Sequence, residues 1–428
     1  MKVLHLNTYS LLKNKSFPHF IFHNDLLNLG HESLIISAKG DVVDEKVKIL
    51  ENSKKIPFFF SATVRKFLFQ ILKNNNTNYF YPEWNLDNIN VTDIIEQVPF
   101  KPDVIMTYWT KFAFNQKLVH DLSNYYNSPV LSVLVDMAPL TGGCHYSGNC
   151  DNYKRSCGNC HILKSSSPND LSNSTWLYKK KYIDKTNLSL LLGSSELSIQ
   201  AKSSGLTKQL KTYKMLLTVD ETVFYSKGKT KARTFFNIPI NKKVIFFGAA
   251  NLKHPRKGMI YLINALKKLS SIKKDSYRNN DIILLIAGKK LKNIDIPFDF
   301  INLGYLQNTN DLARAFRACD VFACPSVEDS GPYMINQSIM SGRPVVAFQM
   351  GVSSDLIING NTGYISKMRD SDEFSTGLHK ILSLSESQWK DISQNCRELG
   401  LSRFSRNVNM NNLERILFKL INKRDKNF

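Results

Sequence analysis

The chain has 428 residues, of which 43% are hydrophobic and 22% are charged, so it can bury large cores and is too long for one ordinary domain. Its formal net charge of +21 favours contact with polyanions such as nucleic acid, anionic lipid head groups or diphosphates, and does not choose among them. No internal repeat is visible, which argues against a solenoid or a propeller.

The first residues, Met1–Asn7, have the pattern of a buried strand and are too short an apolar run for a signal peptide. No segment of the chain reaches the roughly 18 uncharged apolar residues that a membrane-spanning helix needs. We therefore expect a cytoplasmic protein, whose seven cysteines are thiols or metal ligands rather than disulfides.

Short apolar runs alternate with amphipathic helical patterns along the whole chain, which predicts parallel sheets with crossover helices. In the first half, the predicted strands are Lys2–Asn7, Ser33–Ser37, Asp103–Tyr108, Val130–Asp136 and Leu188–Ser194. In the second half, they are Lys243–Gly248, Asp281–Gly288, Phe300–Gly304, Val321–Pro325 and Pro344–Phe348. The clearest helix is Asn310–Cys319, with Asn310 as its expected N-cap.

A polar, turn-rich stretch at 220–231 separates the two sets of strands and is the predicted linker. We therefore predict two α/β domains, 1–219 and 232–404, followed by a helix within 405–428 that packs back on the first domain. Open parallel sheets bind ligands beyond the carboxyl ends of their strands, where loops meet helix N-termini. These patterns predict two Rossmann-like domains that bind a phosphorylated ligand in a cleft between them.

The loop that follows the predicted strand Lys243–Gly248 ends in Arg256, Lys257 and Gly258, just before a predicted helix at Met259–Leu269. Gly248 has no Cβ, so a ligand can approach the backbone there. Two cations beside a helix N-terminus can hold a diphosphate. Taken alone, this pattern favours an ordinary connecting loop with solvated charges.

The stretch Cys324–Ser338 is more informative, because it follows a strand, carries Glu328 and Asp329, and then opens a helix after Gly331. Free amides at the start of that helix can accept phosphate oxygens, and a carboxylate there can accept hydrogen bonds from sugar hydroxyls. A lone acid would be read as a helix cap, but the cluster favours a ligand site.

Four motifs of the second half resemble the donor-binding domain of retaining GT-B glycosyltransferases of family four in their order and spacing. They are Ile301–Leu306, Ala318–Glu328, Met340–Phe348 and Asn361–Tyr364, and the Arg-Lys-Gly loop agrees with them. The first half matches more loosely, through Asp136–Tyr146, which resembles a bacterial surface-polysaccharide branch of that family.

The resemblance implies an enzyme that moves a hexosyl-type sugar from a UDP- or GDP-sugar to a glycan or lipid-linked acceptor with retention of configuration. No catalytic metal is expected, because cationic side chains and helix dipoles stabilise the leaving group. Arg256 and Lys257 would neutralise the diphosphate, Glu328 and Asp329 would hold the transferred sugar, and amides near Gly331 would cradle phosphate.

The donor motif departs from the family at its second acid. The family usually has two glutamates eight residues apart, and here the second position is Gln337 if aligned from Gly342, or Asn336 if counted from Glu328. An amide can still bond ribose hydroxyls, because it is both donor and acceptor. The preference for nucleotide and sugar is therefore expected to differ.

In the first domain, the resemblance implies that Asp136 faces the reacting sugar. The family often has histidine before this acid, where this chain has Val135, so we expect the sugar contact to be missing or supplied by His145 on the acceptor side. The first loop also lacks the family's glycine run, and Lys13 or Lys15 is the expected substitute.

Four cysteines gather in the predicted insertion 141–163 and suggest structural zinc in a reducing compartment, with reduced thiols as an equally weighted alternative. They are Cys144, Cys150, Cys157 and Cys160, whereas Cys319, Cys324 and Cys396 have the surroundings of core or helix residues.

The aromatic and basic stretch Phe58–Phe69 suits an interfacial helix on an anionic membrane, but a core helix with a solvated basic face is at least as well supported. Three rival functions remain open: an epimerase of the same shape, a nucleic-acid-binding protein, and a catalytically inactive homologue. No recognised nucleic-acid-binding signature is present, so we expect no nucleic-acid partner.

Overall fold

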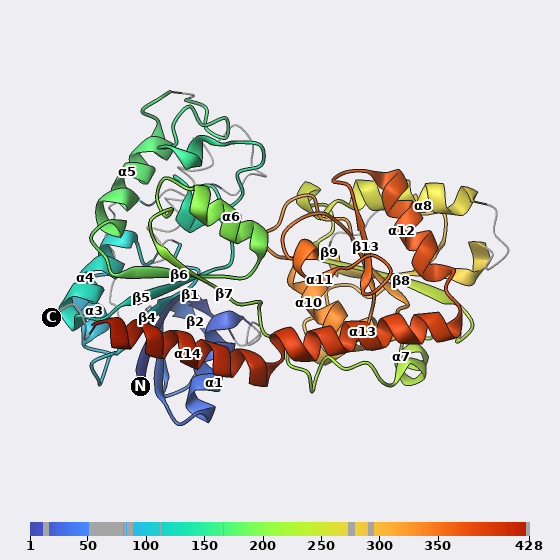
Figure 1. Ribbon diagram of the computed structural model, residues 1–428, viewed down its shortest axis with the longest axis horizontal. Helices are drawn as coiled ribbons and strands as arrows, with labels where there is room; N and C mark the ends of the chain where they lie inside the picture. Colours follow the sequence, from blue (N-terminus) through green and yellow to red (C-terminus); the bar gives the residue numbers. More distant parts are fainter. Residues whose placement is uncertain are drawn as a thin grey trace. The chain divides into compact units, whose positions relative to one another are not determined.

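The computed structural model describes residues 1–11, 17–50, 80, 83, 89–111, 113–165, 167–272, 279–289 and 295–424. The chain forms two compact units (Figure 1). The first unit comprises Met1–Gly193, Leu197–Met215 and Met410–Phe428, and the second comprises Ser194–Glu196 and Leu216–Asn409.

The first unit contains a sheet of seven parallel strands in the order β3-β2-β1-β4-β5-β6-β7. The strands are β1 (Lys2–Ser10), β2 (Glu32–Gly40), β3 (Val47–Ile49), β4 (Val104–Thr107), β5 (Val130–Leu134), β6 (Leu188–Leu192) and β7 (Lys211–Lys214). This is a doubly wound, Rossmann-like order with one added edge strand. The sequence patterns do not predict β3 or β7, because β3 is very short and β7 begins and ends on an exposed lysine.

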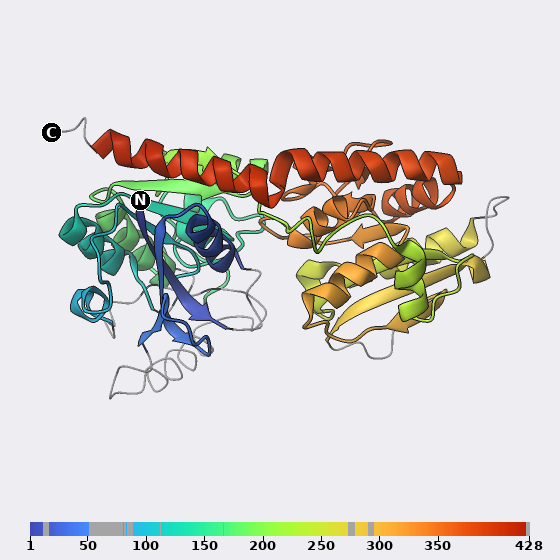
Figure 2. The ribbon, with the colours of Figure 1, turned by 90° about the horizontal axis from the view of Figure 1, so that it is seen from below.

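Helices cover both faces of this sheet (Figures 1 and 2). They are α1 (Pro18–Asn28), α3 (Val91–Ile95), α4 (Gln116–Tyr126), α5 (Leu171–Ile183), α6 (Ser195–Ser203) and α14 (Arg406–Arg424), with 3-10 turns at Ala138–Leu140 and Asn152–Lys154. Alternate residues of β1 point to opposite faces of the sheet. Val3 packs in a cluster with α1 and α14, whereas Leu4 and Leu6 pack in a cluster with α4 and α5.

Three histidines are buried between α1 and the sheet. His5 of β1 makes hydrogen bonds to the Tyr108 hydroxyl at 2.8 Å and to Ser33 Oγ at 2.9 Å, and His23 Nδ1 lies 2.7 Å from the same Ser33 oxygen. Burial lowers the pKa of His5, and it lowers the pKa of His19 to about 3 and of His23 to about 4. These rings are therefore neutral at physiological pH.

The second unit contains six parallel strands in the order β10-β9-β8-β11-β12-β13, the same doubly wound arrangement. The strands are β8 (Lys243–Asn251), β9 (Ile282–Lys289), β10 (Asp299–Asn302), β11 (Val321–Cys324), β12 (Val345–Phe348) and β13 (Gly363–Ser366). The predicted strands of this half are confirmed, and β13, which starts on a glycine, was missed.

The helices of this unit are α7 (Lys229–Phe235), α8 (Met259–Ser271), α9 (Thr309–Ala318), α10 (Tyr333–Met340), α11 (Ser353–Leu356), α12 (Ser371–Leu382) and α13 (Glu386–Phe404), with 3-10 turns at Pro255–Lys257 and Asn279–Asp281. The expected N-cap of α9 was wrong: Asn308, not Asn310, caps this helix by accepting from the Asn310 amide at 2.9 Å. The Asn-Thr-Asn repeat offers two candidates, and only the backbone geometry separates them.

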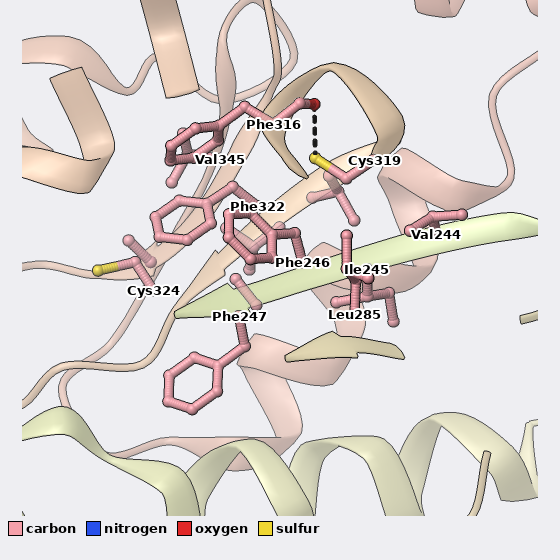
Figure 3. Packing of buried hydrophobic residues seen from close by; sticks show 14 of the residues in the cluster. Val244, Ile245, Phe246, Phe247, Leu285, Phe316, Cys319, Phe322, Cys324 and Val345 are labelled. Carbon is pink, nitrogen blue, oxygen red and sulfur yellow. Dashed lines mark hydrogen bonds between the residues drawn. The ribbon is translucent and has the colours of Figure 1, made fainter. Parts of the chain in front are cut away.

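Aromatic rings fill the centre of this second core. Phe246 of β8, Phe316 of α9 and Phe322 of β11 lie with their ring centroids 5.0–5.6 Å apart (Figure 3). The Cys319 thiol donates to the Phe316 carbonyl at 3.2 Å within this cluster, and Cys324 and Cys396 are also buried, as expected. The packing fixes β8 beside β11, which positions the loops that follow them.

A buried charge cluster anchors α7 to the start of β8. Asp320 accepts from Arg233 Nη2 at 2.8 Å, from Lys229 Nζ at 2.5 Å and from the Val244 amide at 2.6 Å. Burial opposes ionisation of Asp320, but the charges of Lys229 and Arg233 outweigh it and leave the pKa of this carboxyl below its ordinary value. The cluster therefore holds a charged carboxylate inside the unit.

Across the described part of the chain, no helix combines the length and the apolar character that crossing a bilayer requires.

Candidate functional site

The predicted donor residues converge at the carboxyl ends of β8 and β11. These two strands are neighbours at the centre of the second sheet, where the strand order reverses, and such switch points are where open α/β sheets bind ligands. The loop after β8 carries the 3-10 turn Pro255–Lys257, and the loop after β11 carries Glu328, Asp329 and Gly331. The fold thus brings together two loops that are about 70 residues apart in the sequence.

Backbone contacts hold the two loops against each other. The Val327 amide donates to the Arg256 carbonyl at 2.8 Å. Gly258 has a φ of +70°, and a Cβ there would lie 1.7 Å from the Pro325 carbonyl oxygen, so only glycine fits at this crossing. His254 accepts from the Arg256 amide at 3.3 Å and caps the 3-10 turn, a role that the sequence analysis missed.

A half-buried charge cluster forms where the loops meet. Lys257 Nζ donates to Asp329 Oδ2 at 2.5 Å, and Arg256 Nη1 lies 3.3 Å from the same oxygen and donates to the Glu328 carbonyl at 2.6 Å. The side chain of Asp329 is 13% exposed, compared with 15% for Arg256 and 25% for Lys257. The cluster has two cations and one carboxylate in contact, and solvent reaches all three.

The ionisation of Asp329 follows from these contacts. Burial raises the pKa of its carboxyl, but the charges of Lys257 and Arg256 and the hydrogen bond from Lys257 outweigh burial, so the pKa lies below its ordinary value. The same cations, together with burial, lower the pKa of His254, with burial the larger cause. At neutral pH the loops therefore carry a net positive site beside a neutral imidazole.

Asp329, rather than Glu328, contacts the cations with its carboxylate. Its second oxygen lies 3.4 Å from the Gly331 amide, and the N-cap of α10 is Pro332, which makes no side-chain cap. Asp329 is thus not the helix cap that a lone acid would have been. Counting eight residues from Asp329 leads to Gln337, which is buried on α10.

Gly248 has a packing role at this site. A Cβ at this position would lie 2.6 Å from the Met334 Cε atom of α10, so a larger residue would require the Met334 side chain to shift. Gly248 is predicted to let a ligand approach the backbone, and its contact with Met334 is a second reason for a small residue there.

In the first unit, Asp136 follows β5 and pairs with His145. His145 Nδ1 donates to Asp136 Oδ2 at 2.5 Å, and Asp136 Oδ1 accepts from the Ala138 amide at 2.8 Å. Burial raises the pKa of Asp136, but the hydrogen-bonded His145 reverses the shift and the pKa falls below its ordinary value. Burial dominates for His145 and lowers its pKa, so the pair is a carboxylate and a neutral imidazole.

Neighbouring groups fix the loop that carries this pair. Lys179 of α5 is buried and donates to the Ala138 carbonyl at 2.8 Å and to the Thr141 carbonyl at 3.1 Å. The Trp109 ring packs edge-on against His145 with centroids 6.4 Å apart. Asp136 was predicted as a catalytic residue and His145 as an acceptor-side residue, and the structure joins them as one hydrogen-bonded pair.

The four cysteines of the insertion line one cavity of about 20 Å³ in the first unit and are free thiols. Burial raises the pKa of Cys144 to about 12 and of Cys157 to about 11. Within the described ranges, no group of three or more His, Cys, Asp or Glu side chains has an arrangement that could hold a metal ion. Two other predictions, the role of Lys13 or Lys15 and the membrane segment Phe58–Phe69, lie outside the described residues.

Residues 241–384 match the family model described as Glycosyl transferases group 1, and this range contains the whole charge cluster. Two curated relatives are D-inositol 3-phosphate glycosyltransferases, from Stackebrandtia nassauensis and Mycobacteroides abscessus, each 23% identical over 177 and 176 residues. The alignments cover 39% and 38% of this chain and 39% and 37% of the relatives, so the chain matches well under half of each relative's length.

Several solved structures are similar over nearly the whole chain. Sucrose-phosphate synthase from Thermosynechococcus elongatus has a TM-score of 0.65 at 14% identity and covers 98% of this chain and 100% of its own. HepE from Anabaena, in complex with UDP and glucose, has a TM-score of 0.61 at 15% identity, with 97% and 99% covered. A glycosyltransferase from Rickettsia africae has a TM-score of 0.62 at 16% identity, with 98% of each chain covered.

Identities this low establish a common fold and leave the substrate open. The second unit thus carries a Glycosyl transferases group 1 domain, and the two parallel-sheet units together have the GT-B fold predicted from the sequence.

Proposed function

We propose that this protein is a retaining glycosyltransferase that moves a sugar from a nucleotide-sugar donor to a glycan or lipid-linked acceptor. The observation that carries the proposal is the Arg256–Lys257–Asp329 cluster at the switch point of the second sheet, inside the range that matches Glycosyl transferases group 1. Two clustered cations beside the carboxyl ends of parallel strands are suited to a diphosphate.

The donor would bind with its diphosphate on Lys257 and Arg256. The Gly331 amide, now 3.4 Å from an oxygen of Asp329, is a further donor for phosphate. Glu328 and Asp329 are the acids available to accept hydrogen bonds from the transferred sugar, and Gln337 is the amide available to the ribose. HepE has been crystallised with UDP and with UDP-glucose, which supports a UDP-linked donor here, with a GDP-linked donor as the alternative.

Transfer breaks the bond between the sugar's anomeric carbon and the diphosphate, and the acceptor hydroxyl forms the new bond on the same face. The departing phosphate oxygen takes the proton of that hydroxyl. Charge that develops on the diphosphate strengthens its hydrogen bonds to Lys257 and Arg256, which lowers the barrier without a catalytic metal. The pre-organised loops supply these donors with little rearrangement, because Gly258 and the Val327 amide lock them together.

We assign the acceptor to bacterial surface-polysaccharide synthesis. Support comes from the motif around Asp136, from the net charge of +21, which suits a protein working beside anionic lipid, and from similarity to WaaG, a glycosyltransferase involved in lipopolysaccharide biosynthesis. WaaG has a TM-score of 0.56 at 11% identity. On this proposal the protein acts in the cytoplasm, in reversible contact with the inner face of the cell membrane.

A thermal-shift screen with UDP, GDP, ADP and CMP tests donor binding. A nucleotide at 100 times its dissociation constant should stabilise the folded protein by about 2.7 kcal/mol. Transfer from the selected nucleotide sugar, with the anomeric configuration of the product read by NMR, then tests the reaction. Absence of any shift with all four nucleotides would contradict the proposal.

A binding protein without transfer activity is the second candidate, and Gln337 in place of the usual glutamate favours it. Nucleotide binding without transfer or donor hydrolysis would support this candidate. Conversion of a nucleotide sugar to its epimer without an acceptor would instead indicate an epimerase.

A further inference from the structure

We propose that Asp136 is a positioning residue that fixes the tautomer of His145, and that the Nε2 atom of His145 accepts a hydrogen bond from a hydroxyl of the acceptor sugar. The pair lies in the loop that follows β5, where His145 Nδ1 lies 2.5 Å from Asp136 Oδ2. The contact with the sugar rests on the proposed function. The tautomer of His145 follows from the loop itself and does not depend on that function.

Both carboxylate oxygens of Asp136 already accept hydrogen bonds within the loop. Oδ1 accepts from the Ala138 amide at 2.8 Å, and Oδ2 accepts from His145. The side chain of Asp136 is 9% exposed. A sugar hydroxyl would have to displace one of these partners in order to bind Asp136 directly. The imidazole is therefore the member of the pair that is suited to contact a sugar.

The contact with Asp136 decides which ring nitrogen of His145 carries the proton. A carboxylate can only accept, so the protonated nitrogen is Nδ1. Burial lowers the pKa of His145 and keeps the ring neutral. A neutral imidazole that is protonated on Nδ1 presents Nε2 as a hydrogen-bond acceptor, which suits the hydroxyl of a sugar as its donor.

The fold of the loop keeps the pair in place. The Met137 amide donates to the His145 carbonyl at 3.0 Å and so closes the loop, and the buried Lys179 ammonium donates to the Ala138 carbonyl at 2.8 Å. The Trp109 ring, which follows β4, packs edge-on against the imidazole with centroids 6.4 Å apart. The strand order of the first sheet reverses between β1 and β4, so His145 lies beside the place where such sheets bind ligands.

Replacing Asp136 by asparagine should move the proton of the imidazole. The Ala138 amide can only donate, so the asparagine oxygen takes the place of Oδ1 and the NH2 group faces His145. Because an NH2 group also can only donate, Nδ1 becomes the acceptor and the proton moves to Nε2. ¹⁵N NMR distinguishes protonated from unprotonated ring nitrogens, and the His145 signals are those lost in His145→Gln. Wild-type protein should carry the proton on Nδ1, and Asp136→Asn should carry it on Nε2.

The same substitution should impair transfer and leave nucleotide binding intact. The assay uses the nucleotide sugar selected by the thermal-shift screen and octyl glycosides as acceptor probes. Asp136→Asn should lower kcat/KM for the acceptor by about tenfold to a hundredfold, because the bound hydroxyl loses its acceptor, while the Kd for UDP stays unchanged. Asp103→Asn is the matched control. Asp103 accepts from the Lys2 amide at 2.7 Å just before β4, so its substitution should change neither the His145 signals nor transfer.

His145→Asn is the second variant if Asp136→Asn fails to fold. Its shorter amide can still donate to Asp136 but has no atom at the Nε2 position, so transfer should fall to the same extent. The proposal is overturned if wild-type His145 is protonated on Nε2, or if folded Asp136→Asn transfers as the wild type does. Failure of the wild type to glycosylate any of the glycosides would overturn the sugar contact. A wild type that binds no nucleotide would instead contradict the proposed function, and the NMR measurement would still decide the tautomer.

Discussion

Replacing Asp329 by asparagine should tighten the binding of UDP. In the structure Lys257 Nζ lies 2.5 Å and Arg256 Nη1 lies 3.3 Å from the same Asp329 oxygen, so a diphosphate has to share these donors with a carboxylate or displace it. A charged hydrogen bond contributes about 1.5–3 kcal/mol and a neutral one about 0.5–1.5 kcal/mol. Asparagine keeps a neutral acceptor, so the competition weakens by about 1–2 kcal/mol, which is a fivefold to thirtyfold lower Kd.

Lys257→Ala should act in the opposite direction. It removes a charged donor to the diphosphate and should weaken UDP binding by about 1.5–3 kcal/mol, a tenfold to hundredfold effect on Kd or more. Stability should change little, because Asp329 keeps Arg256 as a partner and solvent reaches the site. Transfer by Asp329→Asn should fall although UDP binds more tightly, because the sugar loses a charged acceptor.

Isothermal titration of UDP into the two variants and into Glu328→Gln measures these effects. Glu328 contacts Arg256 through its carbonyl, so Glu328→Gln is the matched control for loss of a nearby charge and should change Kd by less than about threefold. The reasoning is refuted if folded Asp329→Asn binds UDP no more tightly than the wild type does. Unchanged UDP affinity in folded Lys257→Ala would show that the diphosphate binds elsewhere.

Three further outcomes concern stability. In the folded protein the pKa of His19 is about 3 and that of His23 is about 4, against an ordinary value of 6.5. The unfolded state therefore binds more protons, and the free energy of unfolding falls as the pH drops from 6.5 towards 4. The loss is about 2 kcal/mol per histidine at pH 5. Denaturant unfolding at pH 5 and 7.5 should show this loss, and His23→Gln should reduce it; equal stability at both pH values would contradict it. Asp320→Ala leaves Lys229 and Arg233 without their carboxylate partner and should lower the free energy of unfolding by about 3–5 kcal/mol in the same assay. A loss under about 1 kcal/mol would refute the anchoring role. Gly258→Ala should cost about 2 kcal/mol or more and abolish nucleotide-induced shifts, whereas wild-type binding would mean that the loops can separate.

The sequence predicted the central strands of both sheets because they are rich in apolar residues and buried on both faces, as in β1 and β8. The edge strands were harder, since their burial depends on one neighbour only. β7, with exposed lysines at both ends, has no local signal that distinguishes it from a loop. Its place in the sheet comes from pairing with β6.

That these residues lie close together could be predicted from the sequence, because Arg256 and Lys257 are adjacent in the chain and the acids follow directly after a strand. The sequence could not predict which carboxylate contacts Lys257 and Arg256, because Glu328 and Asp329 are adjacent acids. The backbone conformation decides which of the two side chains points toward the cations. The pairing of Asp136 with His145 depends on the fold of the loop between them. Their spacing along the chain carries no comparable signal.

The contact between the loops that follow β8 and β11 has a consequence for how this site can vary. The hydrogen bond from the Val327 amide and the absence of a side chain at Gly258 hold the two loops together independently of the side chains of Asp329 and Gln337. Positions such as Asp329 and Gln337 are then free to exchange acid for amide, or a long side chain for a short one, while the loops stay where they are. If the proposed function is correct, a few side-chain changes at these positions can alter which sugar the protein accepts, and attempts to redesign its donor preference should start there and leave Gly258 unchanged.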